Sequence, residues 1–179
     1  MRLLLVIGTF VAFGIALASL RSRAQELSTV ERVDRLVVNK SEHSMEAYDQ
    51  GRLVAQYRVA VGGGRLGPKL YEGDRRTPEG RYRIDGRHRS RHFHRFLHVS
   101  YPNRDDRRRH RAARRHGSIP THRGIGGSIG LHGSPQRGLS TLAPNVRWNW
   151  TDGCIAVTND EIEVLYRAVI RNAIIEIRP

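Results

Sequence analysis

The residues best suited to chemistry are one cysteine and one histidine upstream of it. Cys154, the only cysteine of the chain, stands in "TDGCIAVTN", and His132 stands in "IGLHGS". A thiol is a nucleophile when it ionises, and a histidine within hydrogen-bond reach is its usual base. We select His132 because it lies between glycines in an apolar segment, whereas the other histidines lie in arginine-rich or polar segments.

Gly153, directly before the cysteine, completes a possible reaction centre. Without a Cβ, it lets the backbone N–H groups of Gly153 and Cys154 approach a tetrahedral oxyanion. Cys154, His132 and such a pocket together indicate acyl transfer. The alternative is that Cys154 packs as an inert, buried small hydrophobe, which is common for a free cysteine.

The elements that must position these residues are mainly strands. Apolar residues alternate on a period of two and predict an antiparallel meander, with Gln50 and Gly51 in a tight turn. A long ordered loop rich in Gly, Pro, Asp and Arg follows over 62–86. The predicted strands are 34–40, 44–49, 52–62, 80–84, 128–133, 153–157 and 173–177, with a further apolar patch at 95–101.

One helix is predicted after the cysteine. Thr158 and Glu161 form a capping-box pattern, and acidic residues fill the first turn. The apolar face is predicted to hold Ile162, Leu165, Tyr166, Val169 and Ile170. The segments 104–127 and 134–150 are predicted to be loops. The expected fold class is therefore mainly β with one substantial helix.

The first 24 residues do not belong to the folded domain. Arg2 precedes an uncharged run, Leu3 to Ala18, and Ala16-Leu17-Ala18 is a cleavage-site pattern. We predict a signal peptide or, as the alternative, an uncleaved N-terminal anchor over 1–24, followed by one catalytic domain over 25–179. The expected location is outside the cytoplasm, in the periplasm or cell envelope, where an unpaired cysteine is unusual.

The chain is strongly basic, with a net charge of +14, and the arginines and histidines concentrate in 87–123. We interpret this segment as a basic insertion that attracts an anionic cell-wall polymer or membrane surface; the alternative is a solvated loop without a ligand. Export and the lack of a basic-aromatic RNA-binding motif argue against nucleic acid. His92 and His94 are the only plausible metal pair, and the surrounding positive charge argues against a metal site.

Three ordered motifs resemble one family. "GDRRTPEGRYRI" (73–84), "IGLHGS" and "TDGCIAVTNDEIEVLY" are similar to the L,D-transpeptidase catalytic domain, the YkuD-like fold, over roughly 34–179. The resemblance implies a β-sandwich that needs no cofactor. It also implies that Cys154 is the nucleophile, that His132 is its base oriented by the carbonyl of Gly133, and that Gly153 and Cys154 supply oxyanion N–H groups.

The resemblance further implies the reaction. Cys154 would attack the amide before the terminal D-alanine of a peptidoglycan stem peptide, form a thioester and pass the acyl group to an amine. Water in place of the amine would give a carboxypeptidase or amidase. The alternative from another class is a non-enzymatic basic module that binds an anionic wall polymer or nucleic acid. The candidate substrate-binding residues are Gly130, Ser134, Thr151 and Ala156.

Two departures from the family pattern affect the site. Asp152 stands where most members have a second histidine, and its charge would raise the pKa of the thiol unless it pairs elsewhere. We expect Asp152 to orient a histidine or a substrate amine. Ala156 stands where an arginine or asparagine is common, so basic residues of 87–123 are expected to recognise the donor carboxylate instead.

Overall fold

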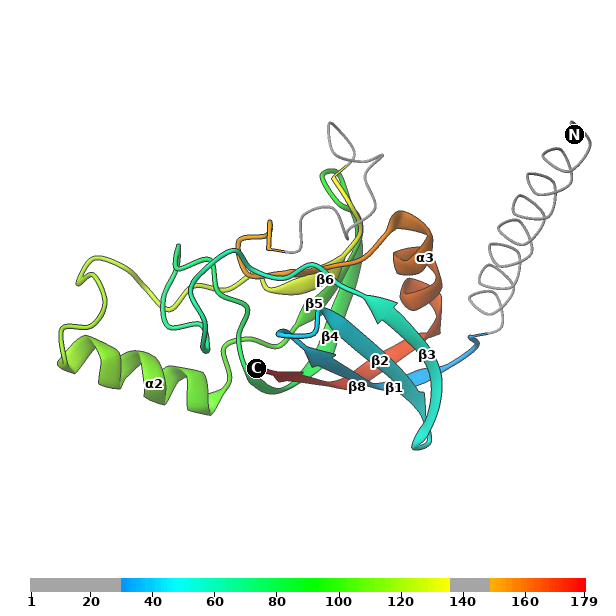
Figure 1. Cartoon of the computed structure of the whole chain (residues 1–179), viewed down its shortest axis with the longest axis horizontal. Helices are drawn as coiled ribbons and strands as arrows, with labels where there is room; N and C mark the ends of the chain where they lie inside the picture. Colours follow the sequence, from blue (N-terminus) through cyan, green and yellow to red (C-terminus); the bar gives the residue numbers. More distant parts are fainter. Residues whose placement is uncertain (1–29, 136–148) are drawn as a thin grey trace, which may run out of the picture.

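A curled sheet of eight strands dominates the computed structural model, which describes residues 30–135 and 149–179. The sheet order is β3-β2-β1-β8-β4-β5-β6-β7 (Figure 1). The mainly β prediction is confirmed, and the predicted signal segment 1–24 lies outside the described residues. The strands are β1 (Val33–Asn39), β2 (Ser44–Asp49), β3 (Arg52–Arg58), β4 (Gly80–Ser90), β5 (His94–Val99), β6 (Gly130–His132), β7 (Ile155–Ala156) and β8 (Val169–Arg178).

The first three strands form the predicted meander. β1 pairs antiparallel with β2, and β2 pairs antiparallel with β3. Gln50 and Gly51, between β2 and β3, have φ values of 50° and 83°. Positive φ at both turn residues matches the right-handed twist of the strands, as in a type I′ hairpin. The turn chemistry of this pair was therefore predicted correctly.

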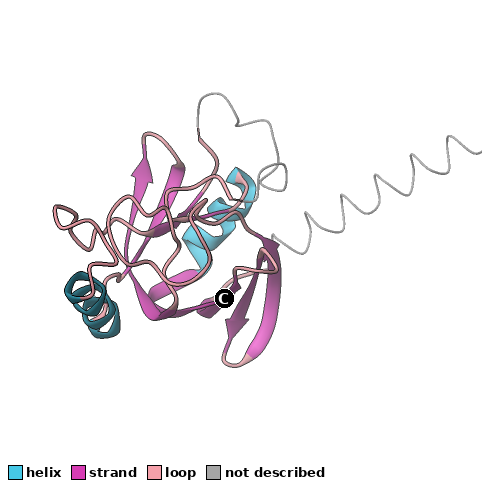
Figure 2. Ribbon diagram, turned by 60° about the vertical axis from the view of Figure 1, so that its left-hand side comes forward, coloured by secondary structure: helices cyan, strands magenta, loops and turns pink. Residues whose placement is uncertain are grey.

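β4 extends well beyond the predicted strand 80–84 and joins the two halves of the sheet. Its first residues pair with β8, and its later residues pair with β5. The register shifts between Ile84 and Gly86, which bends the strand as a bulge does. Figure 2 shows the strands of the two halves running in different directions. Residues 87–90 and 94–99 are thus strands of the sheet, which corrects the interpretation of the whole segment 87–123 as an insertion.

The chain beyond β3 closes the curl. Ala60 exchanges two backbone hydrogen bonds of 2.8 Å with Ala156 of β7, and the N–H of Gly63 donates to the carbonyl of Thr151 at 3.0 Å. Since β3 and β7 are the first and last strands of the sheet, these contacts connect its two ends. The apolar core, including Leu36, Ile84 and Leu131, is buried inside the curl.

The predicted helix is α3 (Asn159–Ala168). The backbone N–H of Glu161 donates to Thr158 Oγ1 at 3.2 Å, and the N–H of Thr158 donates to Glu161 Oε2 at 2.9 Å, which confirms the capping box. The prediction extended the apolar face of the helix too far along the chain, because Val169 and Ile170 are the first residues of β8. Val169 is already extended, with ψ 118°, as suits a β-branched residue.

A second helix, α2 (Arg104–Arg115), replaces part of the loop that we predicted over 104–127. Asn103 is a favourable N-cap residue, and its Oδ1 accepts from the N–H groups of Asp105 and Asp106 at 2.9 and 3.0 Å. The prediction failed because the segment has too few apolar residues to show helical periodicity. Over the residues that the structure describes, no helix is long and apolar enough to span a bilayer.

Candidate active site

The short parallel pair β6–β7 brings the cysteine and the histidine together. His132 is paired with Ala156, and the N–H of Val157 donates to the carbonyl of His132 at 3.0 Å. Cys154 directly precedes β7 (Ile155–Ala156). The Cys154 sulfur lies 3.6 Å from the carbonyl oxygen of Ser128, which is two residues before β6. The parallel pair therefore places the predicted nucleophile, directly before β7, next to the strand that ends in the predicted base.

His132 is held as a neutral base. Its Nδ1 lies 2.7 Å from the carbonyl oxygen of Gly133, and because a carbonyl only accepts, Nδ1 carries the proton and Nε2 keeps its lone pair. This is the contact that the resemblance implied. The imidazole stacks on Phe93 at 4.2 Å and is also flanked by Phe96 and Trp150. Burial lowers the pKa of His132 to about 4, although the Gly133 carbonyl opposes this shift.

Cys154 is half-buried and holds its proton at rest. Burial raises the pKa of the thiol, while the Gly130 N–H and the Lys69 charge lower it and the Asp152 charge adds to the rise. The thiol donates to the carbonyl of Ser128 at 3.6 Å. Transfer of the proton to His132 requires the thiol to leave this carbonyl. The resting pair is therefore a thiol and a neutral imidazole, and ionisation accompanies attack on a substrate.

Two threonines fix the backbone of the nucleophile. Thr151 Oγ1 donates to the carbonyl of Cys154 at 2.7 Å, and Thr77 Oγ1 donates to the same oxygen at 3.4 Å. Thr151 also accepts from the N–H of Gly153 at 3.2 Å. Thr151 was predicted to bind substrate, but its buried hydroxyl is engaged within the loop. The predicted oxyanion role of Gly153 needs correction as well, because its N–H is already bonded, which leaves the Cys154 N–H as the predicted donor.

Gly153 is required for its conformation. Its φ is +124°, and a Cβ would lie 2.7 Å from the carbonyl oxygen of Arg76. An L side chain at this position would be strained and would collide with backbone. The glycine therefore lets the nucleophile loop pass close to the loop that carries Thr77.

Thr77 is a site residue that sequence reasoning missed. It is buried, and its Oγ1 also accepts from the N–H of Gly62 at 2.8 Å. The motif "GDRRTPEG" contained it, but nothing in the local pattern connects it to a cysteine far along the chain. Thr77 therefore ties the long loop, the segment after β3 and the nucleophile to one another.

A buried ion pair stiffens the same loop. Lys69 Nζ lies 2.7 Å from Asp74 Oδ1, and both side chains are almost fully buried. Asp74 also accepts from the N–H groups of Leu70 and Arg76 at 2.7 and 3.0 Å. Burial alone would raise the pKa of Asp74, but the Lys69 ammonium and these N–H groups outweigh it and lower the pKa. The charge of Lys69 is thus fixed where it also favours the Cys154 thiolate.

The other predicted substrate-binding residues are built into the fold. A Cβ on Gly130 would lie 2.2 Å from the Phe96 ring, so only glycine fits there. The N–H of Ser134 donates to Asn159 Oδ1 at 2.9 Å, and Ser134 is buried. Ala156 is 1% exposed, and both its backbone groups bond to Ala60. These residues shape the site rather than present side chains to it.

Asp152 pairs with an arginine and not with a histidine. Arg75 Nε donates to Asp152 Oδ1 at 2.8 Å, and the Asp152 side chain is 88% exposed. Arg75 also donates through Nη2 to the carbonyl of Trp150 at 3.5 Å. The expectation that Asp152 orients a histidine is therefore wrong, and its other form, that Asp152 orients a substrate amine, stays a prediction. The Asp152 carboxylate instead pairs with Arg75, and the positive charge of Arg75 moderates the effect of Asp152 on the pKa of the Cys154 thiol.

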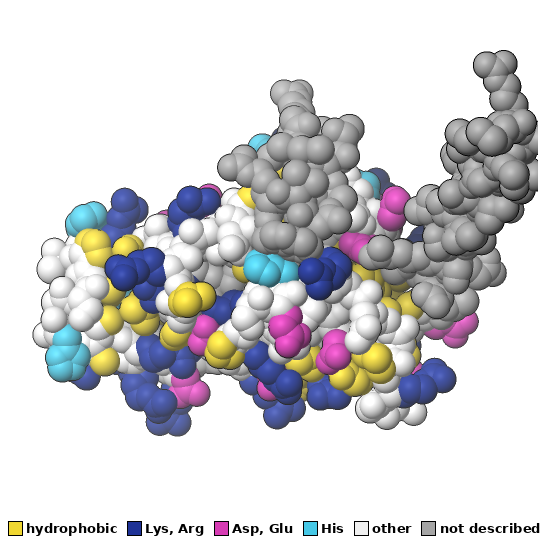
Figure 3. Space-filling view, in the orientation of Figure 1, with side chains coloured by type: hydrophobic (Ala, Val, Ile, Leu, Met, Phe, Trp, Pro, Cys, Tyr) yellow, Lys and Arg dark blue, Asp and Glu magenta, His cyan; other side chains and the backbone are white. Residues whose placement is uncertain are grey.

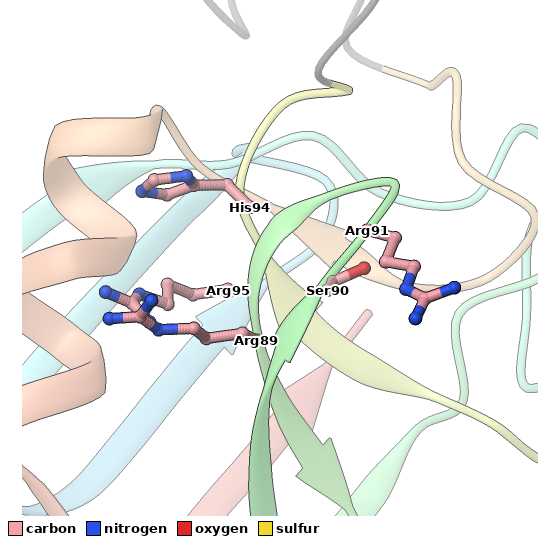
Figure 4. A pocket seen from close by; sticks show the side chains of 5 residues that line it. All are labelled: Arg89, Ser90, Arg91, His94 and Arg95. Atoms are coloured by element: carbon pink, nitrogen blue, oxygen red, sulfur yellow. The ribbon is translucent and has the colours of Figure 1, made fainter.

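A basic hollow of about 500 Å³ lies at the tip of the β4–β5 hairpin (Figure 4). Phe93, in the same hairpin turn, stacks on His132. Glu163 accepts from His94 at 2.7 Å and from Arg95 at 2.8 Å. Across residues 30–135 and 149–179, no group of three or more His, Cys, Asp or Glu could hold a metal ion. The residues lining the hollow are Arg89, Ser90, Arg91, His94 and Arg95.

Comparison with known proteins identifies the family. The model of the L,D-transpeptidase catalytic domain, YkuD, matches residues 33–177, and the chain belongs to this family. The predicted resemblance is thereby confirmed. A comparison with curated proteins gives no match.

Solved structures share the fold. The helical cell shape determining protein Pgp2 from Campylobacter jejuni has 24% identity and a TM-score of 0.60, over 81% of this chain and 47% of that one. Bd1075 of Bdellovibrio bacteriovorus has 18% identity and a TM-score of 0.54, over 82% and 50%. The L,D-transpeptidase of Xylanimonas cellulosilytica has 13% identity and a TM-score of 0.52, over 83% and 62%. The chain spans about half the length of the first two proteins.

Proposed function

We propose that this protein is an exported L,D-transpeptidase that transfers acyl groups between peptidoglycan stem peptides through a thioester at Cys154. The observation that carries the proposal is the pairing of β6 with β7, which places Cys154 next to the strand of His132, a neutral imidazole whose Nε2 keeps its lone pair. Membership of the family supports the substrate class. The signal-like segment 1–24 supports the envelope location.

The first half-reaction releases the terminal residue. His132 Nε2 takes the thiol proton as Cys154 Sγ bonds to the carbonyl carbon of the amide before the terminal D-alanine. The N–H of Cys154 donates to the oxyanion that forms. The imidazolium then protonates the leaving amine, and the C–N bond breaks. D-alanine is released, and the rest of the stem peptide stays bound to Cys154 as a thioester.

The second half-reaction restores the enzyme. An amine of a second stem peptide attacks the thioester carbon and gives a proton to His132. The C–S bond breaks, and the imidazolium returns the proton to the sulfur. Water as the acceptor would release a free carboxylate and make the protein a carboxypeptidase or amidase. We favour transfer because the family model that matches residues 33–177 is that of the L,D-transpeptidase catalytic domain.

Incubation with purified muropeptides followed by mass spectrometry tests the proposal. The protein should release D-alanine and form a dimer whose mass equals that of the two muropeptides less D-alanine. Cys154→Ala should do neither, and Thr121→Ala is the control because Thr121 is exposed and makes none of the contacts that the mechanism uses. A shortened monomer without a dimer would favour hydrolysis. If the folded wild-type protein leaves the muropeptides unchanged, the proposed enzymatic activity is refuted.

A further inference from the structure

The outward face of α2 consists of arginine. Six of its arginines are exposed, and at 100° per residue they fall within an arc of about 120°. Figure 3 shows the dark-blue side chains that gather along the edge of the molecule where Figure 1 places α2. These arginines are Arg104, Arg107, Arg108, Arg111, Arg114 and Arg115.

The charge of this arginine face is largely uncompensated. Asp105 lies 3.1 Å from Arg108, and this is the only ion pair that the six arginines make within the described ranges. Holding like charges on one helix face costs free energy. The summed field of such a stripe attracts a polyanion, whose binding would offset this cost.

The opposite face of α2 is firmly attached to the domain. Tyr82 Oη donates to buried Asp106 at 3.0 Å, and Arg109 donates to the carbonyl of Glu79 at 3.1 Å. His110 Nδ1 lies 2.7 Å from the carbonyl of Leu70 and donates to it. Leu70 is the neighbour of Lys69 in the loop that also supplies Thr77 to the nucleophile. The arginine face is therefore anchored to the loop that shapes the active site.

We propose that the arginine face of α2 binds the carboxylate-rich peptidoglycan polymer outside the catalytic site. This inference rests on the proposed function, because it gives the enzyme a second contact with its own substrate. Guanidinium groups bind carboxylates through two parallel hydrogen bonds, and several such pairs along a helix add up. The face contains no apolar side chain that could enter a bilayer, which favours the polymer over a lipid surface.

Co-sedimentation with isolated sacculi tests the proposal. In a Cys154→Ala background, where turnover plays no part, Arg107→Gln/Arg111→Gln/Arg115→Gln should bind about tenfold more weakly. The control Arg52→Gln/Arg167→Gln/Arg171→Gln removes the same charge from exposed arginines elsewhere. It should bind within about threefold of the parent, and added salt should weaken the parent more than the α2 variant.

Several results would overturn the proposal: equal loss in both triple variants, no loss in the α2 variant, or a loss confined to phosphatidylglycerol vesicles. Arg107→Lys/Arg111→Lys/Arg115→Lys keeps the charge but loses the paired hydrogen bonds, so it should bind more weakly than the parent and more tightly than the glutamine variant. Binding no tighter than that of the glutamine variant would also count against the proposal. Turnover of soluble muropeptides by the same triple variants with Cys154 intact is read separately. If no variant turns them over, the proposed function fails while the sacculus result still decides the role of α2.

Discussion

The backbone N–H of Val157 donates to the carbonyl of His132 at 3.0 Å, which links the strand after the nucleophile to the strand of the base. The relative position of Cys154 and His132 is thus set by main-chain bonds between β6 and β7 rather than by a flexible loop. Such positioning is worth much in catalysis, because misplacement by about 1 Å can cost a hundredfold in rate.

Burial of His132 predicts a pH-dependent stability. Its pKa is about 4 in the folded protein and near 6.5 when unfolded, so the unfolded chain binds an additional proton between these values. The free energy of unfolding should therefore fall by about 3 kcal/mol from this group as the pH drops from 6.5 to 4. Urea unfolding at pH 7 and pH 4 measures it. His132→Gln should lose this component and His122→Gln should keep it; an equal decline in all three proteins would contradict the assignment.

Asp152→Asn should make the thiol more reactive. The carboxylate raises the pKa of Cys154, and its removal also leaves the Arg75 cation without its partner, so both effects favour the thiolate. The pH midpoint at which the rate of iodoacetamide alkylation increases should be lower in Asp152→Asn than in the wild type, and salt should reduce the difference between the two midpoints. Because Cys154 is the only cysteine, the adduct reports this thiol alone. Asp105→Asn serves as the control; an unchanged or higher pH midpoint in Asp152→Asn would be evidence against the effect.

Thr151→Val should loosen the nucleophile loop. The buried hydroxyl serves both the Cys154 carbonyl and the Gly153 N–H, and valine satisfies neither. Unsatisfied buried groups of this kind cost about 1–3 kcal/mol. Urea unfolding should show that loss, with a slower release of D-alanine, whereas exposed Thr121→Val should change stability by less than about 0.5 kcal/mol. If Thr151→Val were as stable as the wild type, these hydrogen bonds would contribute nothing to the free energy of unfolding.

Gly130→Ala should be destabilising because its Cβ would meet the Phe96 ring at 2.2 Å. Overpacking of this kind costs about 1–3 kcal/mol. Phe96→Leu in the same chain should recover part of the loss, which thermal unfolding can measure. Gly124→Ala is the matched control, since its Cβ would meet nothing within 4 Å. Equal midpoints for the two single variants would refute the packing argument.

The sequence predicted the elements whose signals are local. The meander, the capping box of α3 and the pairing of a Gly-bounded histidine with a Gly-Cys motif all follow from residue order within short windows. The contact of Thr77 with the Cys154 carbonyl could not be predicted in this way, because two loops far apart in sequence meet only after the sheet curls. The same holds for Arg75 and Asp152.

The errors over 87–123 have one physical origin. Periodicity detects apolar faces, and α2 buries Asp106 and His110 instead, so its helical pattern was polar on every side. The later residues of β4 are also exposed and basic, and backbone pairing with β5 rather than apolar alternation makes them a strand. Charge therefore concealed regular structure in the segment that we interpreted as an insertion.

Intact mass measurement after exposure to a carbapenem tests the central claim most directly, since this agent itself acylates a nucleophilic cysteine and leaves a thioester of known mass. The account predicts one covalent adduct per chain, mapped to Cys154, absent in Cys154→Ala and formed orders of magnitude more slowly in His132→Ala. A folded wild-type protein whose Cys154 resists acylation, or His132→Ala that reacts at the wild-type rate, would contradict it.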